Sequence, residues 1–341
     1  MSVVPSTQAA APAGRARDNF SHWLLAQRGL LLAVAIFAVM FLVYGWKLNV
    51  GLTANIINTA ANKGALLALV AMAQTLPVIT GGLDLSVGMI FVLTNCLASV
   101  VVVGGPVSAF FGILLVLGVG LLCGFINGVI VVYGRLQPII VTLATGAVYF
   151  GCSLAIRPQP GGSVNFEFAD LMTRSWAGVP STVILLIAVV LLIWMPYRRS
   201  VLGRGAYAIG SSEQAAYMSG VPVARARLLA YTLAGLFAAI AGILLTCITY
   251  SGAAKASLAN DYTLNSIGAV VIGGTSLFGG VGSAVGSIFG AFVMRTVGDL
   301  LIVFDINPVL QPLFVGIVLL FAVSIGSLRI LRVKNKLDLY R

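Results

Sequence analysis

Long apolar runs constrain this chain more than any other feature. Hydrophobic residues make up 60% of its 341 residues and charged residues only 9%, whereas a soluble domain is about half apolar and about a quarter charged. A single core cannot bury so much apolar surface, so most of the chain must have lipid as its solvent. At about 20 residues for each crossing, the length allows on the order of ten spans. The sequence therefore predicts an all-α integral membrane protein.

Ten apolar segments are candidates for these spans. The first, at 29–46, ends in Tyr44 and Trp46, an aromatic pair typical of a membrane interface. It is too long for the apolar region of a signal peptide and no A-x-A site follows it, which favours a retained span. Several of the other nine are short or interrupted by glycine and proline. They are expected at 63–80, 85–103, 107–133, 139–156, 181–197, 228–249, 262–277, 284–303 and 309–326.

The charge distribution predicts the orientation of the chain. Its net charge of +11 does not indicate a nucleic-acid partner, because the basic residues gather in a few short segments between spans. Their asymmetry predicts a multi-pass protein of the bacterial inner membrane with both termini in the cytoplasm. One transmembrane domain at 29–328 is expected between cytoplasmic tails at 1–28 and 329–341. Only a few basic residues would then lie outside: Lys47, Lys63, Arg157, Arg174 and Lys255.

Residues for covalent or metal chemistry are scarce. The four cysteines lie singly within apolar runs, and the only histidine, His22, precedes the first span. This pattern indicates neither a disulfide framework nor a metal site. The chain also lacks a G-x-x-x-x-G-K-[ST] phosphate-binding loop. We therefore expect a protein that is not an enzyme, binds no cofactor and cannot hydrolyse ATP by itself.

Two stretches of the chain resemble each other. The stretch at 79–86 aligns its Gly81-Gly82 pair with Gly273-Gly274 in the stretch at 272–278, and each follows one apolar segment and precedes another. In the same way Gln137-Pro138 and Gln311-Pro312 are each expected to open an apolar helix. Glycine-broken helices in two related halves are typical of transporters, where the exposed backbone lines a cavity or is buried in protein. The match is short, so chance similarity is the alternative.

Asp84 is the sharpest polar feature within these stretches. Its carboxylate can accept hydrogen bonds from the first backbone N–H groups of a helix that begins near Leu85, as an N-cap does. A second interpretation places Asp84 and Ser86 beside a solute path, because a carboxylate near membrane depth normally faces a wet or protein-lined surface. The two interpretations are compatible.

Other polar residues within apolar runs have two interpretations each. Asn127, Thr142 and Asn265 either line a path or form hydrogen bonds between helices. Arg295 and Asp299 are four residues apart, so they can pair on one helix face or take part in gating.

The basic segment at 198–227 contains a short helix former. Glu213, Gln214, Ala215 and Ala216 favour a helix, which Gly220 and Pro222 would end. An ordinary cytoplasmic loop whose arginines only fix the orientation is the simple alternative.

Several motifs in order resemble one known family. The sequence GGLDLSVG at 81–88 is similar to the signature of ribose-type ABC permeases, the sugar branch of a superfamily that includes branched-chain amino-acid permeases. The resemblance continues through GFING at 124–128, QPIIVTLAT at 137–145, AIGSSEQAA at 208–216 and AVVIGGTSL at 269–277, and covers about residues 50–328. In the amino-acid branch an Asn-Leu pair more often replaces Asp84-Leu85, which favours the sugar branch.

The resemblance implies a function and partners. It implies a permease that moves a monosaccharide into the cytoplasm by alternating access, with a periplasmic sugar-binding protein, a separate cytoplasmic ATPase that holds ATP and Mg, and a second permease copy or a paralogue. The segment at about 210–222, with Glu213, Gln214, Ala215, Ala216 and Ser219, would be the coupling helix for the ATPase. The same architecture carrying an amino acid or nucleoside is an alternative. An ion-coupled secondary transporter is another, but it does not explain the segment at 213–216.

Overall fold

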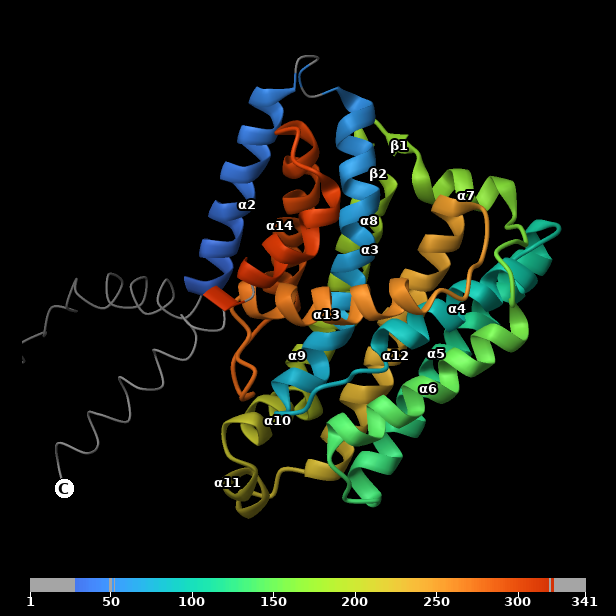
Figure 1. Cartoon of the computed structure of the whole chain (residues 1–341). Coiled ribbons are helices and arrows are strands. Elements are labelled where there is room, and N and C mark those ends of the chain that lie inside the picture. The colour runs from blue at the N-terminus through green and yellow to red at the C-terminus, as the bar shows by residue number, and fades with distance from the viewer. Residues whose placement is uncertain (1–27, 49–50, 52, 319, 322–341) are drawn as a thin grey trace, which may run out of the picture.

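The computed structural model describes residues 28–48, 51, 53–318 and 320–321 (Figure 1). Nearly all of the predicted tails, 1–28 and 329–341, and the second half of the predicted span 309–326 therefore lie outside the described residues. Within the described part the protein is helical apart from one hairpin, in which β1 (Ser175–Trp176) pairs antiparallel with β2 (Val179–Pro180). The prediction of an all-α membrane protein is confirmed.

Within the residues that the structure describes, seven helices are long and apolar enough to cross a membrane. They begin and end close to predicted spans, although the second begins nine residues earlier than expected. Their ranges are α2 (Arg28–Lys47), α3 (Ala54–Ile79), α5 (Pro106–Tyr133), α6 (Pro138–Ile156), the continuous run of α8 (Ser181–Val189), η1 (Val190–Trp194) and α9 (Met195–Arg199), α12 (Val223–Thr249) and α14 (Ala284–Val303).

The remaining three predicted spans correspond to shorter helices. The segment expected at 85–103 forms α4 (Val87–Val101), of 15 residues, and the last segment is the short apolar helix Pro308–Val318, which opens with η2 (Pro308–Leu310). The span expected at 262–277 is wrong in position. It forms α13 (Ala256–Ile272), which ends at Gly273 and lies crosswise to α2, α3 and α14 (Figure 1).

Three shorter helices lie outside the long ones. Helix α7 (Phe166–Thr173) precedes the β1–β2 hairpin, and α10 (Val201–Ser211) and α11 (Glu213–Met218) connect α9 to α12. Figure 1 shows α7 and α11 at opposite ends of the molecule.

Helix α3 lies at the centre of the core. Every residue from Gly64 to Ile79 is buried, as expected for a helix that is apolar on all sides. It packs against α12, α14, α13 and α4. Helix α2 is the opposite case, because only Ala33 is buried among its described side chains and it packs mainly on α14.

Glycine allows α5 and α12 to approach closely. A Cβ atom added to Gly124 would lie 2.2 Å from the carbonyl oxygen of Tyr231, and one added to Gly235 would lie 2.1 Å from that of Gly120. Small residues of this kind let two membrane helices bring their backbones together. The contact fixes α12 against α5 along much of its length.

Both stretches of the predicted repeat are breaks between helices, and they touch. The α3–α4 break turns at Gly81, with φ +80°, and the α13–α14 break turns at Gly274, with φ +84°. The Gly280 N–H donates to the Ile79 carbonyl oxygen at 3.0 Å. The second predicted pair also opens helices, because Pro138 begins α6 and Pro312 lies in the first turn of the α-helical part that follows η2.

Candidate translocation and coupling site

A buried polar cluster joins the α3–α4 break to α5 and α6. The side chain of Asp84 is fully buried, and its Oδ1 accepts from the Ser86 N–H at 2.9 Å and from the Ser86 hydroxyl at 2.6 Å. The Asn127 amide on α5 donates to the Ser86 Oγ at 2.7 Å. The Tyr149 hydroxyl on α6 donates to the Asn127 Oδ1 at 3.0 Å. The break is therefore held by side chains of two long helices.

Thr142 adds a second link between the break and α6. Its Oγ1 accepts from the Leu85 N–H at 2.9 Å and donates to the Pro138 carbonyl oxygen at 2.9 Å. Asp84 and Ser86 were predicted together, Asn127 and Thr142 separately, and the structure brings these four residues together around the α3–α4 break. Tyr149 was not predicted, because a tyrosine within an apolar helix carries no distinctive sequence signal.

The predicted role of Asp84 as a helix cap needs correction. Helix α4 begins at Val87, and its N-cap residue is Ser86. The carboxylate of Asp84 accepts from the N–H of Ser86, so Asp84 supports the N-cap residue and is not the N-cap itself. The cluster thus orients the broken segment. The side chain of Ser86 makes no cap bond, and the start of α4 is capped from α13, where the Thr263 hydroxyl accepts from the Gly88 N–H at 3.1 Å.

Two buried oxygens in this region lack partners among the described residues. They are the Oδ2 of Asp84 and the hydroxyl of Tyr231 on α12. A Cβ atom on Gly82 would lie 2.5 Å from that hydroxyl, so the hydroxyl lies directly against the break. An unpaired buried acceptor costs about 1–3 kcal/mol. Such a cost at a helix break indicates a place where a polar solute or water can bind in another state.

A cavity of about 820 Å³ adjoins this break. Gly81, Gly82 and Tyr231 form one wall, and Glu213 with Arg227 forms another. Its size lies within the range of about 300–1,000 Å³ that encloses small ligands.

The remaining path candidates lie elsewhere. Asn265 is half-buried on α13, outside the cluster. Gly273 packs against the backbone of Gly286, and Gly274 packs against Gly29 at the start of α2. These two glycines therefore serve close helix packing in this structure, and they do not line the cavity beside Gly81 and Gly82.

Helix α11 forms where the short helix was predicted, but it is narrower than 210–222. The Ser212 hydroxyl caps it by accepting from the Ala215 N–H at 3.3 Å, and it ends at Ser219 and Gly220. Gly210 belongs to α10 instead.

The side chains of α11 are divided between two environments. Arg227 of α12 donates two hydrogen bonds of 2.8 Å to the carboxylate of Glu213, and Ala216 is buried. Gln214 and Ala215 are exposed. Tyr217 and Met218 were not predicted, yet they are 75% and 87% exposed. Large side chains this exposed at the tip of a helix are typical of a contact with another protein.

Helix α10 meets both helix breaks at Gly210. A Cβ atom on Gly210 would lie 2.0 Å from the Ile79 carbonyl oxygen and 2.2 Å from the Gly280 backbone nitrogen. The Tyr207 hydroxyl, also on α10, donates to the Gly282 carbonyl oxygen at 2.9 Å. The three backbones are in direct contact, so α10 packs on both breaks without intervening side chains.

The predicted pair of Arg295 and Asp299 does not form. Asp299 instead faces Lys63 of α3, with 4.0 Å between Nζ and Oδ1. The spacing of four residues brought the two side chains onto one face of α14, but a residue from another helix offers the nearer cation. Within the described residues, no group of three His, Cys, Asp or Glu side chains is placed to hold a metal ion.

Long apolar helices with paired breaks, a buried carboxylate cluster and a short exposed helix define a membrane transport protein of the permease class. The family described as branched-chain amino acid transport system / permease component matches residues 56–323. The chain belongs to this family.

Three relatives illustrate the match. The ribose import permease protein RbsC of Bacillus subtilis (strain 168) is 34% identical, over 86% of this chain and 89% of its own. RbsC of Escherichia coli (strain K12) is 32% identical, over 89% and 94%. The fructose import permease protein FrcC of Rhizobium meliloti is 32% identical, over 91% and 87%. No solved structure matches the chain.

Proposed function

We propose that this protein is the membrane subunit of an ABC importer that moves a monosaccharide into the cytoplasm. The family membership supports a transport subunit, and the relatives named for ribose and fructose support a sugar. The contact of α10 with both helix breaks at Gly210 is the observation that carries the mechanism. It offers a direct route from an exposed helix to the buried cluster around Asp84.

In this proposal the chain performs no covalent chemistry. A separate cytoplasmic ATPase holds ATP and Mg and contacts α11 through its exposed side chains, Tyr217 and Met218 among them. Closure of the ATPase displaces α11 and α10, and Gly210 transmits the movement to the breaks that begin at Thr80 and Gly273. The α3–α4 break then changes its exposure, so that the solute meets alternating sides of the membrane.

The remaining partners follow from the same proposal. A periplasmic sugar-binding protein delivers the solute on the face opposite α11, and a second copy of the chain or a paralogue completes the permease. The protein lies in the bacterial inner membrane with both termini in the cytoplasm, which places the basic α9–α12 segment on the inside.

An ion-coupled secondary transporter is the second candidate. The buried Asp84, with one oxygen unpaired among the described residues, favours it, because membrane-depth carboxylates often carry protons or ions. This candidate gives no role to the exposed α11. An amino acid or nucleoside as solute would leave the ABC mechanism unchanged.

Uptake into proteoliposomes separates these candidates. We expect uptake of a labelled monosaccharide by the permease assembled with its ATPase and binding protein, and we expect it to require ATP and the binding protein. Vesicles with ATP omitted, or with the binding protein omitted, are the matched controls. Uptake driven by an ion gradient alone would contradict the ABC mechanism. Uptake of an amino acid in place of the sugar would contradict the assignment of a monosaccharide as the solute.

A further inference from the structure

Helices α2, α3 and α14 enclose a second, smaller cavity, of about 260 Å³. Its walls are largely aromatic and aliphatic, and the start of α8 closes one side. About half of the side chains of α2 are exposed, only Ala33 is buried among its described side chains, and α2 packs mainly on α14. The cavity therefore lies between the helix core and the surrounding bilayer. Its lining is Phe37, Phe41, Tyr44, Ile57, Ala60, Ala61, Pro180, Val183, Phe292, Arg295, Thr296 and Asp299.

Charged groups stand at one end of this α2–α14 slot. Arg295 and Asp299 lie on one face of α14, and Lys63 of α3 approaches Asp299. The Nε of Arg295 is inaccessible to solvent, and the Arg295 side chain forms no hydrogen bond or ion pair with any described residue. Arg295 and Asp299 line the slot, and Lys63 lies beside it against Asp299, so the three groups together carry one excess positive charge. A cation at this depth costs free energy unless an anion pairs with it.

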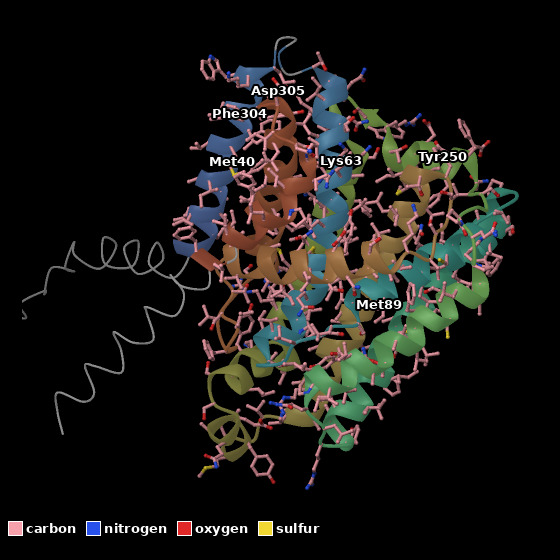
Figure 2. The ribbon with its side chains drawn as sticks, viewed as in Figure 1. Met40, Lys63, Met89, Tyr250, Phe304 and Asp305 are labelled. Carbon is pink, nitrogen blue, oxygen red and sulfur yellow. The ribbon has the colours of Figure 1, made fainter. Side chains whose placement is uncertain are left out.

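The charged end of the slot lies near a membrane interface. Helix α2 ends at Trp46 and Lys47, and Trp46 is 81% exposed, as expected of an interfacial anchor. The ammonium of Lys47 lies 5.4 Å from the centre of the Phe304 ring, so α2 and α14 end at the same level. Figure 2 shows Lys63 in the same half of the molecule as Phe304 and Asp305. Asp299 is about one helical turn below the end of α14, and Arg295 about two.

We propose that the α2–α14 slot binds one anionic phospholipid, with its phosphate against Arg295 and Lys63 and part of an acyl chain between Phe37, Phe41 and Phe292. A guanidinium is well suited to bind a phosphodiester. The cavity of about 260 Å³ is too small for a whole phospholipid, so in this proposal the rest of the lipid lies in the bilayer. Lipid binding in this slot is independent of the solute that the protein transports.

Native mass spectrometry of the purified full-length chain tests this proposal. The protein is stripped of lipid in detergent and titrated with phosphatidylglycerol or phosphatidylcholine. We expect one tightly bound phosphatidylglycerol, and about tenfold weaker binding in Arg295→Gln, because a charge-assisted hydrogen bond is worth at least that factor. Ala60→Phe, which fills the slot, should abolish binding. Arg174→Gln, which removes a cation that does not line the slot, should leave binding unchanged.

Three results would overturn the proposal. They are wild-type affinity in both Arg295→Gln and Ala60→Phe, equal affinity for phosphatidylcholine, and a loss in Arg174→Gln as large as that in Arg295→Gln. If Ala60→Phe does not fold, the comparison of Arg295→Gln with Arg174→Gln decides by itself, because both replace an arginine by a side chain of similar polarity.

Discussion

Asp84 lies in a break between two helices, with one carboxylate oxygen bonded to Ser86 and the other unpaired among the described residues. The bonded oxygen orients the break, while burial of the unpaired one costs folding free energy without a compensating hydrogen bond from any described residue. This difference separates the structural role of the side chain from a role in transport.

Asp84→Asn tests the two roles at once. The amide oxygen can still accept from the Ser86 N–H, so we expect the free energy of unfolding to change by less than about 1 kcal/mol. Uptake by the assembled transporter should fall at least tenfold if the unpaired oxygen contacts the solute. Thermal unfolding in detergent and uptake in proteoliposomes measure the two effects.

Asn265→Ala is the control for this substitution. It removes a half-buried polar side chain of α13 that is outside the cluster, and uptake should remain close to wild type. Full uptake in Asp84→Asn with a lowered thermal midpoint would leave Asp84 only its structural role.

For single residues, the sequence predicts which polar side chains are candidates better than it predicts which of them contact one another. A polar side chain within an apolar run is costly unless it faces the protein interior or a cavity. For this reason the sequence could predict Asp84, Ser86, Asn127 and Thr142 as candidates. Which of them meet depends on tertiary packing, so Asn265 could not be excluded beforehand. Tyr231 was missed because its ring looks like ordinary core, and only its unpaired hydroxyl makes it unusual.

Among the helices, the close approach of α5 and α12 depends on glycine on both sides. Gly124→Val would force a side chain against the Tyr231 backbone. Overpacking of this kind costs about 1–3 kcal/mol, so we expect a lower thermal midpoint and a lower yield of folded protein.

Gly118→Val is the matched control on the same helix. A Cβ atom on Gly118 would meet nothing within 4 Å, so the two substitutions carry the same change in helix propensity and differ only in packing. Equal losses in both variants would show that propensity, and not the α5–α12 contact, sets the stability.

The existence of the long apolar helices could be predicted because their length and composition are sufficient, although α3 begins nine residues before the predicted span. The position of helix α13 could not be predicted in this way. Its run at 262–277 is apolar enough to resemble a span, but the Gly273-Gly274 turn ends the helix, and packing against Gly286 and Gly29 sets its position. Only the folded chain shows that α13 lies crosswise (Figure 1).

Across the whole molecule, the contact at Gly210 connects the exposed α10–α11 segment to both breaks. Gly210→Ala inserts a methyl group where the Ile79 oxygen and the Gly280 nitrogen now lie. We expect the assembled transporter to retain ATP hydrolysis while uptake falls at least tenfold, because the altered joint no longer transmits the movement.

Gly151→Ala is the control, because a Cβ atom there would meet open space. ATPase activity and uptake are measured on the same preparations, so a protein that fails to assemble is recognised by the loss of both. Normal uptake in Gly210→Ala would show that the movement follows another route.

The burial of α3 has a consequence for biogenesis. Its mean hydropathy of 1.4 is the lowest of the seven long helices, and the helices that cover it include α12, α13 and α14 from the far end of the chain. During synthesis the ribosome releases α3 early and its covering helices last. Until α12, α13 and α14 are inserted, α3 lies in the membrane or the translocon with side chains such as Gln74 not yet buried by these helices. The packing of α12, α13 and α14 around α3 can therefore be completed only when translation is almost finished.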